Sequence, residues 1–393
     1  MAAFQPADVR EAADIVRQAA AEGRRLEIRG GGSKAAYGAG PAADIDIDIL
    51  DTGRLVAIVD YDPQELVLTA QAGARLSDIE PLLAGNRQML AFEPPRLNAL
   101  LGSAAEPTLG GILAANLAGP RRLSAGAARD HFLGFEAVSG RGLAFKAGGR
   151  VVKNVAGFDL PKLMAGAWGA LAALTTVTVK VVPRPRTAAT VVLVELSDAR
   201  AVQAMTAALR LPAEVSGAAH LPQMDGQAVT ALRVEGFAPS VAVRVERLKS
   251  TLKGFGEIVV LDEADTTELW ASVREVAPLA ARPGALWRLS LPPTHGARAT
   301  AALAGDGARW IYDWAGGLVW LSLAEPRAAR VRAVAGELGG HATLVRSDRT
   351  AGAPAFHPEA PAVAALTARV RTAFDPQGVF ADRRGLGSLG SGA

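Results

Sequence analysis

The stretch that decides the fold is residues 26–33, which read Leu-Glu-Ile-Arg-Gly-Gly-Gly-Ser. A short strand pattern here runs directly into three consecutive glycines. Such a turn can curl until several backbone N–H groups point at one anion. A diphosphate needs this kind of nest, because side chains would keep the backbone too far away. Taken alone, the cluster fits a plain flexible turn equally well.

The main rival interpretation is a Rossmann loop, in which the glycines must open a helix. Residues 35–41 read Ala-Ala-Tyr-Gly-Ala-Gly-Pro, and this composition will not start one. A nicotinamide-binding Rossmann enzyme is therefore disfavoured. Around the glycines, apolar spacing predicts a helix over 7–22 and strands over 45–49, 54–61, 65–72, 132–138, 143–146 and 175–182.

A second cluster, residues 107–120, pairs two glycines with a run of small residues and one Asn. Small residues in a row let a bulky planar ligand approach the backbone, but they also suit a tightly packed helix. Residues 94–130 as a whole show weak periodicity. A long apolar segment of this kind inside a compact domain is typical of a functional loop.

Two more segments combine charged or amide side chains with glycine. Arg121 and Arg122 precede residues 129–134, Arg-Asp-His-Phe-Leu-Gly, and a surface loop with a salt bridge is the alternative to a ligand site there. Residues 152–163, Val-Lys-Asn-Val-Ala-Gly-Phe-Asp-Leu-Pro-Lys-Leu, place an Asn and an Asp at a sharp turn.

The composition sets outer limits on function. The chain has 393 residues and a formal charge of +3, which excludes a strongly basic nucleic-acid-binding protein. It has no cysteine, which excludes disulfides, thiolate metal sites, iron–sulfur ligation and a cysteinyl–flavin link. Residues 163–179 carry no charge but are short for a membrane span, which needs about 20 apolar residues. We expect a buried helix there that runs into a buried strand.

The pattern changes after residues 183–186, Pro-Arg-Pro-Arg, where two prolines mark a domain boundary. Strands are predicted over 190–196, 230–235, 257–261, 286–291, 310–314 and 318–323, and helices over 199–209, 241–253, 327–338 and 361–373. This alternation indicates an α+β domain with helices packed on a sheet.

Taken together and in order, the four segments at 29–33, 107–120, 121–134 and 152–163 resemble the FAD-binding domain of the vanillyl-alcohol-oxidase, or PCMH-type, superfamily. Residues 286–292, 313–321 and 374–376 extend the resemblance to the FAD-binding E subunits of bacterial glycolate oxidases. The resemblance implies an α+β fold: a PCMH-type FAD-binding domain of two α+β subdomains, followed by an α+β cap domain with an antiparallel sheet. The implied bounds are 1–185 for the FAD-binding domain, 186–360 for the cap, 361–385 for a segment that packs back on the FAD domain, and 386–393 for a mobile tail.

The resemblance also implies which residues hold FAD. The first group would wrap the diphosphate, the second would border the flavin, the third would line the cofactor, and the fourth would contact the ring or adenine side. In this order they are Arg29, Gly30, Gly31, Gly32 and Ser33; Pro94 and Pro95; Thr108, Gly110, Gly111, Ala115, Asn116 and Gly119; and Asp130, Asn154, Gly157 and Asp159. Oriented amides can hold a diphosphate without a dedicated lysine.

Three departures from the family pattern matter. The first loop has no His and the chain no Cys, so the FAD is expected to be noncovalent. Trp168 stands where the family's Gly-Ser-Glu-Gly-Thr-Leu-Gly motif has its Glu. The five histidines are far apart in sequence, so a local His metal site is unsupported and no catalytic base is identified. Arg288 is a candidate partner for a substrate carboxylate, with a structural salt bridge as the alternative.

The resemblance implies a subunit of a multi-subunit glycolate oxidase, which converts glycolate to glyoxylate, with a larger FAD subunit and an iron–sulfur subunit as partners. The missing histidines lead to the hypothesis that this flavin relays electrons while the partner oxidises the small 2-hydroxy acid. The alternatives are a self-sufficient FAD-dependent 2-hydroxy-acid dehydrogenase and a flavin-free structural subunit. We expect a cytoplasmic protein with no nucleic-acid partner and no transmembrane span, so that any contact with the inner membrane is peripheral and made through partners.

Overall fold

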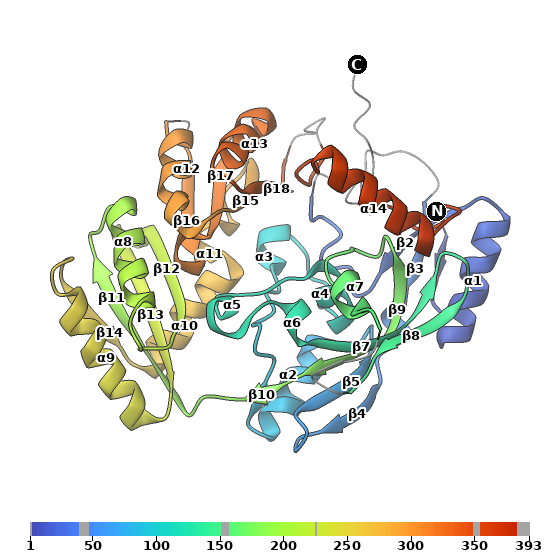
Figure 1. The fold of residues 1–393 in the computed structure, drawn as a ribbon, viewed down its shortest axis with the longest axis horizontal. Helices are drawn as coiled ribbons and strands as arrows, with labels where there is room; N and C mark the ends of the chain where they lie inside the picture. The colour runs from blue at the N-terminus through green and yellow to red at the C-terminus, as the bar shows by residue number, and fades with distance from the viewer. Residues whose placement is uncertain are drawn as a thin grey trace.

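The computed structural model of the protein describes residues 2–38, 47–150, 157–224, 226–305, 307–348 and 354–382 (Figure 1). The strands up to residue 183 form three sheets, and the strands from residue 187 onward form one large sheet. Figure 1 shows the large sheet at the left and the other sheets at the right. Asn154 and the tail at 386–393 lie outside the described residues.

The glycine loop follows a strand of a small parallel sheet. This sheet has the order β1-β3-β2, with β1 at Ala3–Phe4, β3 at Ile47–Asp51 and β2 at Arg25–Arg29. Helix α1 (Val9–Ala21) begins where the Asp8 carboxylate accepts hydrogen bonds from the N–H groups of Arg10 and Glu11. Its buried Val16 packs in one core cluster with Leu26 of β2. The strand that carries the loop is thus anchored by buried side chains.

The second sheet is antiparallel, with five strands in the order β4-β5-β9-β7-β8. In this order they span Ile58–Asp62, Val67–Gln71, Ala172–Lys180, Phe132–Ser139 and Ala144–Gly148. The uncharged stretch at 163–179 comprises the end of α7 (Leu160–Met164), a turn and most of the buried β9. Strand β6 (Gln88–Met89) pairs with β10 (Val182–Pro183), beside α2 (Leu76–Gly85).

Residues 94–130 are not the long loop that their weak periodicity predicts. They contain four short helices, α3 (Asn98–Leu101), α4 (Leu109–Ala115), α5 (Arg122–Ala125) and α6 (Ala128–His131). Helix α4 forms despite two glycines because the Thr108 hydroxyl accepts a hydrogen bond from the Gly111 N–H at 3.3 Å. Burial of Leu109, Ile112 and Leu113 adds packing that periodicity over so short a helix does not reveal.

The cap sheet has eight strands in the order β14-β11-β13-β12-β16-β17-β15-β18, and the neighbours are antiparallel. In this order they span Ile258–Leu261, Thr187–Val194, Gln227–Gly236, Val215–Met224, Arg309–Asp313, Leu318–Leu323, Ala285–Ser290 and His341–Arg346. Strands β12 and β18 add to those predicted. Most of β12 is buried on both faces, so its sequence lacks the alternation that would reveal it.

Alternate residues of the cap strands face different neighbours. Val191 and Leu193 share a core cluster with residues of α8 (Asp198–Leu209) and α9 (Ala238–Leu252). Val192, between them, belongs to the cluster that continues into the first domain, together with Trp270 of α10 (Glu263–Glu275). The remaining cap helices are α11 (Ala277–Ala280), α12 (Gly296–Leu303) and α13 (Ala328–Glu337). One face of the cap sheet therefore packs on α8 and α9, and the other packs on α10 and the first domain.

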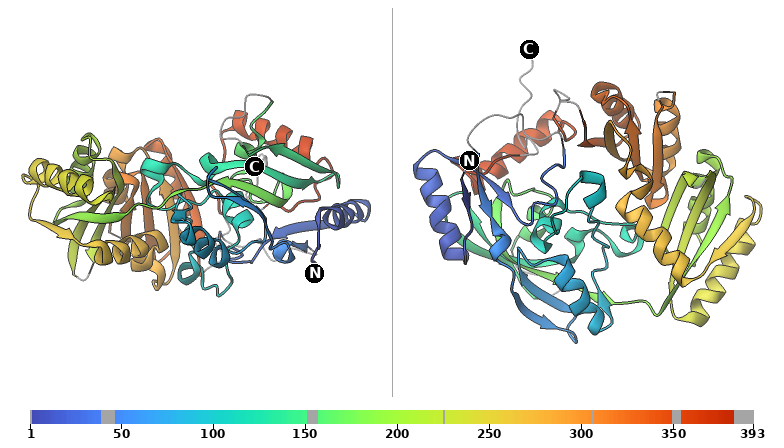
Figure 2. Two further views of the ribbon diagram at one scale, coloured as in Figure 1. Left: turned by 90° about the horizontal axis from the view of Figure 1, so that it is seen from below. Right: turned by 180° about the vertical axis from the view of Figure 1, so that it is seen from behind.

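After the cap, the chain returns to the first domain. Helix α14 (Pro361–Phe374) lies beside this domain in Figure 1 and in the two views of Figure 2. The Asp375 carboxylate then accepts hydrogen bonds from the N–H groups of Val379 (2.9 Å) and Phe380 (2.8 Å). Phe380 is fully buried and bridges to Leu26 of β2. The domain bounds expected from the sequence stay a prediction. Within the described residues, no helix combines the length and apolar character that crossing a bilayer requires.

Candidate cofactor-binding site

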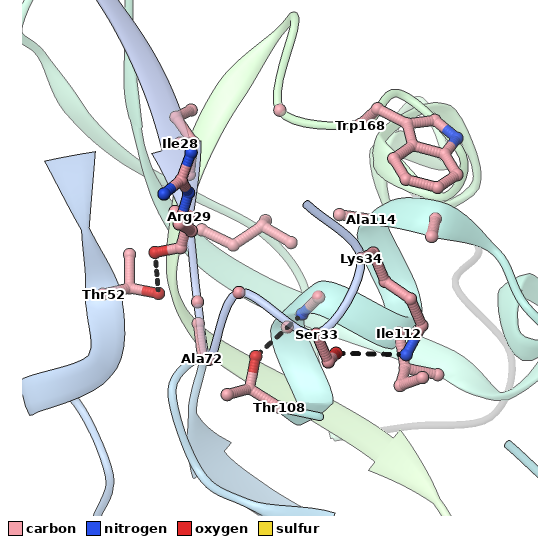
Figure 3. A pocket seen from close by; sticks show the side chains of 18 of the residues that line it. Ile28, Arg29, Ser33, Lys34, Thr52, Ala72, Thr108, Ile112, Ala114 and Trp168 are labelled. Carbon is pink, nitrogen blue, oxygen red and sulfur yellow. Dashed lines mark hydrogen bonds between the residues drawn. The ribbon is translucent and has the colours of Figure 1, made fainter. Parts of the chain in front are cut away.

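A groove lies between the end of β2 and helix α4 (Figure 3). Its open space measures about 770 Å³, including the part open to solvent, which is within the usual range for ligand pockets. Nine of the predicted residues line it: Arg29, Gly30, Gly31, Gly32, Ser33, Thr108, Gly110, Gly111 and Ala115. The structure thus brings the first two sequence clusters together across one groove.

The three glycines are required for two different physical reasons. A Cβ atom on Gly30 would lie 2.4 Å from Thr108 Oγ1, and one on Gly31 would lie 1.9 Å from the Glu106 carbonyl oxygen. The loop can therefore lie against residues 106–108 only where it has no side chains. Gly32 has a φ of +80°, a left-handed conformation that favours glycine.

The loop offers the backbone N–H groups of Gly31, Gly32 and Ser33 as donors. None of the three donates a hydrogen bond to another residue in the part of the chain that the structure describes. Ser33 is nevertheless buried, with 5% of its surface exposed, and buried amides are nearly always paired in folded proteins. Three donors beside one groove, with no partner among the described residues, fit the diphosphate expected for this loop.

Lys34 follows the loop directly and adds a positive charge to the groove. Its Nζ atom donates to the Arg96 carbonyl oxygen at 2.8 Å and lies 3.1 Å from Ser33 Oγ (Figure 3). Burial lowers the pKa of Lys34 to about 8, against the opposing charge of Glu275. Sequence reasoning missed this residue, although its place next to the glycines in a chain with only seven lysines was a usable signal.

The N–H groups in the first turn of α4 donate hydrogen bonds to other residues of the first domain. Leu109 donates to the Ala74 carbonyl oxygen at 2.8 Å, and Gly110 donates to the Ala72 carbonyl oxygen at 2.9 Å. A Cβ atom on Gly110 would lie 2.7 Å from the Ala72 side chain. The second cluster is therefore a tightly packed small-residue helix that also lines the groove, so the two interpretations of its sequence are compatible.

A second cavity of about 1170 Å³, including open space, adjoins the groove, and Ala115 and Trp168 line both. The first domain and the cap both contribute to it, with Tyr37, Asn116, Leu117, Arg122 and Gly166 from the former and Arg288, Ser290, His341 and Thr343 from the latter. The ring centroids of Tyr37 and Trp168 are 4.8 Å apart, and that of Phe356 is 5.6 Å from that of Trp168. Trp168 has a φ of +52°, a strained conformation that its surroundings must hold in place.

The other predicted residues lie outside the groove. Asn116 lines the second cavity, and its Oδ1 accepts from the Arg129 N–H at 3.0 Å. Asp130 accepts from the Ala127 N–H at 2.8 Å at the start of α6. Exposed Gly157 and Asp159 precede α7, and Asn154 lies outside the described residues. Contact of Asn116, Asp130, Gly157 and Asp159 with FAD stays a prediction.

Pro94, Pro95 and Gly119 lie beside a buried charge cluster that joins the two domains. Both prolines are buried next to Glu93, and the Gly119 carbonyl oxygen accepts from Trp314 Nε1 at 3.1 Å. The cluster consists of Glu93 and Arg121 from the first domain with Arg233 and Glu235 from the cap. Burial raises the pKa of Glu235, but the hydrogen bond from Arg121 and the charge of Arg233 outweigh it and lower this pKa to about 2.

The neighbouring arginines at 121 and 122 therefore have different roles. Arg121 donates to both Glu235 carboxylate oxygens at 2.9 and 2.6 Å, so the salt-bridge interpretation holds for it, although in a buried interface rather than a surface loop. The guanidinium groups of Arg122 and Arg288 have no ion pair among the described residues. The salt-bridge alternative for Arg288 finds no partner among the residues that the structure describes.

The five histidines lie at different places in the structure. Within the described ranges, no group of three His, Cys, Asp or Glu residues could hold a metal ion. His220 is fully buried in the cap between Thr230 Oγ1 (2.9 Å) and Asp198 (3.2 Å). His341 and His357 line the second cavity. The spacing of the histidines in the sequence gave no indication that two of them line the same cavity.

Comparisons with known proteins agree with this geometry. The family model described as a FAD binding domain matches residues 1–148. The glycolate oxidase subunit GlcE of Escherichia coli is 34% identical over 93% of both chains. The glycolate oxidase subunit GlcD of Bacillus subtilis is 35% identical over 40% of this chain and 32% of its own.

A solved structure of p-cresol methylhydroxylase with bound substrate has the same fold. It superposes with a TM-score of 0.73 over 98% of this chain and 88% of its own, at 15% identity. This confirms the PCMH-type fold, with its FAD-binding domain and antiparallel cap sheet. FAD is the cofactor of this chain, and the chain is a FAD-linked oxidoreductase. From the groove, the fold and the near full-length match, the chain belongs to the family of the glycolate oxidase subunit GlcE.

Proposed function

We propose that the chain is the FAD-binding subunit of a multi-subunit glycolate oxidase that converts glycolate to glyoxylate. The observation that carries this proposal is the set of N–H groups at Gly31, Gly32 and Ser33, which donate to no other residue that the structure describes. These donors would bind the diphosphate of FAD, and the charged Lys34 beside them would neutralise part of its charge. The name of the E. coli relative supplies the substrate.

The FAD is proposed to be noncovalent. The chain has no cysteine, and the residues that line the groove include no histidine. The cofactor would then be held by oriented amides, by Lys34 and by close contact with the small residues of α4. When bound, FAD supplies an acceptor for the two electrons that leave a 2-hydroxy acid.

The partners belong to the proposal as well. The match to GlcD covers 40% of this chain and 32% of that protein, so a glycolate oxidase subunit other than GlcE is related to this chain over part of its length. We infer an assembly with a larger FAD subunit and an iron–sulfur subunit. In this proposal, the flavin of this chain passes electrons from the larger FAD subunit, which oxidises glycolate, to the iron–sulfur subunit.

A second candidate function is direct oxidation by this chain's own flavin. The observation that favours it is the second cavity, which adjoins the groove at Ala115 and Trp168 and contains two arginines, Arg122 and Arg288, that form no ion pair with another described residue. A cavity beside the cofactor that is lined by two arginine side chains is suited to binding a small acid.

The test is an absorption spectrum of the purified full-length chain, before and after acid precipitation, followed by anaerobic glycolate. We expect a yellow protein that releases its FAD into the supernatant. A colourless protein that FAD cannot reconstitute would refute the cofactor site. Bleaching of the bound FAD by glycolate alone would establish direct oxidation, whereas bleaching only after the larger subunit is added would establish relay.

A further inference from the structure

Trp168 departs from the family motif and has a backbone conformation that few bulky residues adopt. It stands where the motif has a Glu, and its φ of +52° lies in the left-handed region. The nearby Gly166 and Gly169 have φ values of +86° and +81°, which glycine adopts without strain. Glycine at position 168 would form the same turn more easily, so the strained tryptophan indicates a role for its indole.

Contacts on two sides hold this turn in place. The Trp168 N–H donates to the carbonyl oxygen of Ala114 in α4 at 2.9 Å. On the other side, a Cβ atom on Gly169 would lie 3.1 Å from Ile28 Cβ, so the turn packs directly on β2. The turn is therefore held between the helix and the strand that form the groove.

The indole lies at the border between the groove and the second cavity. Trp168 lines both, and Figure 3 shows its ring across the groove from Ile28. Tyr37 and Phe356 line the second cavity but not the groove, and their ring centroids lie 4.8 and 5.6 Å from that of Trp168. These two rings therefore support the indole from the side away from the groove.

The part of the groove beside the indole is suited to a planar ring. Small residues line it there, namely Gly169, Ala114 and Ala115. The Nε1 of Trp168 donates to no other described residue, whereas those of four other tryptophans donate to protein oxygen atoms. A heterocycle can stack on such an aromatic side chain whatever its hydrogen-bonding pattern, because every heterocycle of this kind has a π-face.

The same groove contains the donors for a diphosphate at residues 31–33. In FAD the diphosphate links two planar heterocycles, isoalloxazine and adenine, which share the chemistry of stacking. We propose that Trp168 stacks on one of these rings and thereby positions the cofactor. The inference rests on the proposed diphosphate site, because a ligand held there brings a ring to the indole.

The experiment measures cofactor binding and not turnover. FAD is titrated into the flavin-free full-length protein, and flavin fluorescence gives the dissociation constant. Trp168→Leu removes the ring, Trp168→Phe keeps an aromatic ring, and both keep a side chain on the same strained backbone. Phe356→Leu is the matched control, because it removes a ring from the same cluster on the side away from the groove.

Thermal unfolding shows whether each variant is folded. Trp168→Met is a second non-aromatic variant in case Trp168→Leu does not fold, since the flexible Met side chain adapts to irregular packing.

We expect Trp168→Leu to weaken FAD binding about five- to hundredfold, the usual effect of losing one ring stacked on an aromatic side chain. Trp168→Phe should restore most of the affinity, and Phe356→Leu should bind FAD as wild type does. ADP, which carries the diphosphate and adenine only, distinguishes the two rings. An equal loss of ADP and FAD affinity in Trp168→Leu would identify adenine, whereas a loss for FAD alone, with brighter bound flavin, would identify isoalloxazine.

Two results would overturn the proposal: FAD binding to Trp168→Leu as tightly as to wild type, or an equal loss of FAD affinity in Phe356→Leu. The second would show that the aromatic cluster acts only through the fold. Wild-type protein that bound no FAD would refute the cofactor site itself. Wild-type protein that binds FAD regardless of the side chain at position 168 would refute the stacking alone.

Discussion

Replacing Lys34 by an uncharged residue should separate the effect of this side chain on protein stability from its effect on FAD binding. In the FAD-free protein, the pKa of Lys34 falls from 10.5 to about 8 because the side chain is buried. At about 1.4 kcal/mol per pH unit, holding this charge inside the fold costs about 3 kcal/mol at pH 7. The unfolded chain binds more protons between pH 8 and 10.5, so stability rises with pH across this window and the full cost applies below it.

Lys34→Met should therefore stabilise the FAD-free protein at pH 7. The lost hydrogen bond to the Arg96 carbonyl oxygen offsets about 1 kcal/mol, so we expect a net gain of about 2 kcal/mol that disappears near pH 10.5. Urea unfolding at the two pH values measures it. Lys253→Met, at an exposed position, is the control and should change stability at neither pH.

The same substitution should weaken FAD binding by about tenfold to a hundredfold, the usual range for losing a charged partner. Binding of the diphosphate raises the pKa of Lys34 again, so wild-type protein at pH 8.5 should take up about 0.7 proton per FAD. Titration calorimetry in buffers of different ionisation enthalpy measures this uptake. The reasoning is refuted if Lys34→Met binds FAD as tightly as wild type, or if both proteins take up the same number of protons.

Three further predictions follow from the loop and the domain interface. Gly31→Ala places a Cβ 1.9 Å from the Glu106 carbonyl oxygen, so thermal unfolding should show a loss of about 2 kcal/mol or more together with lower FAD content, while Gly254→Ala, with open space around it, should show neither. Because the pKa of Glu235 is about 2, its carboxylate contributes its full stabilisation above about pH 4.5, and this contribution is lost as the pH falls toward 2. Glu235→Gln should remove about 3 kcal/mol of this pH-dependent stability, measured by urea unfolding at several pH values. An unchanged dependence of stability on acid pH would contradict the assignment. Burial raises the pKa of Asp313 to about 7, so wild-type stability should fall as pH rises from 4 to 7, and Asp313→Asn should remove this fall in pH-resolved unfolding curves.

The sequence was most informative where local chemistry determines structure. Three glycines after a strand predict a tight loop because nothing else can lie against residues 106–108. The second cluster was harder, since ligand contact and helix packing favour the same small residues. Helix α4 satisfies both, and only the capping contact of Thr108 and its buried partners show that a helix forms there.

The remainder depends on contacts between distant parts of the chain. Arg121 and Arg122 are neighbours of identical chemistry, yet Glu235, more than a hundred residues away, pairs with the first only. The place of Arg288 in the second cavity likewise follows only from the packing of the cap against the first domain. Strand β12 was not predicted because a strand that is buried on both faces shows no alternation of apolar and polar residues in its sequence.

The return of the chain to β2 has a consequence for synthesis on the ribosome. Leu26 donates to the Val379 carbonyl oxygen at 2.7 Å and accepts from the Ala381 N–H at 2.8 Å. The residues up to about 185 can fold early, but the edge strand that carries the glycine loop is completed only after residues 379–381 have been translated. A nascent chain, or one truncated before residue 379, would thus lack the strand partner beside the glycine loop, and tight binding of FAD would indicate that translation had passed residue 381.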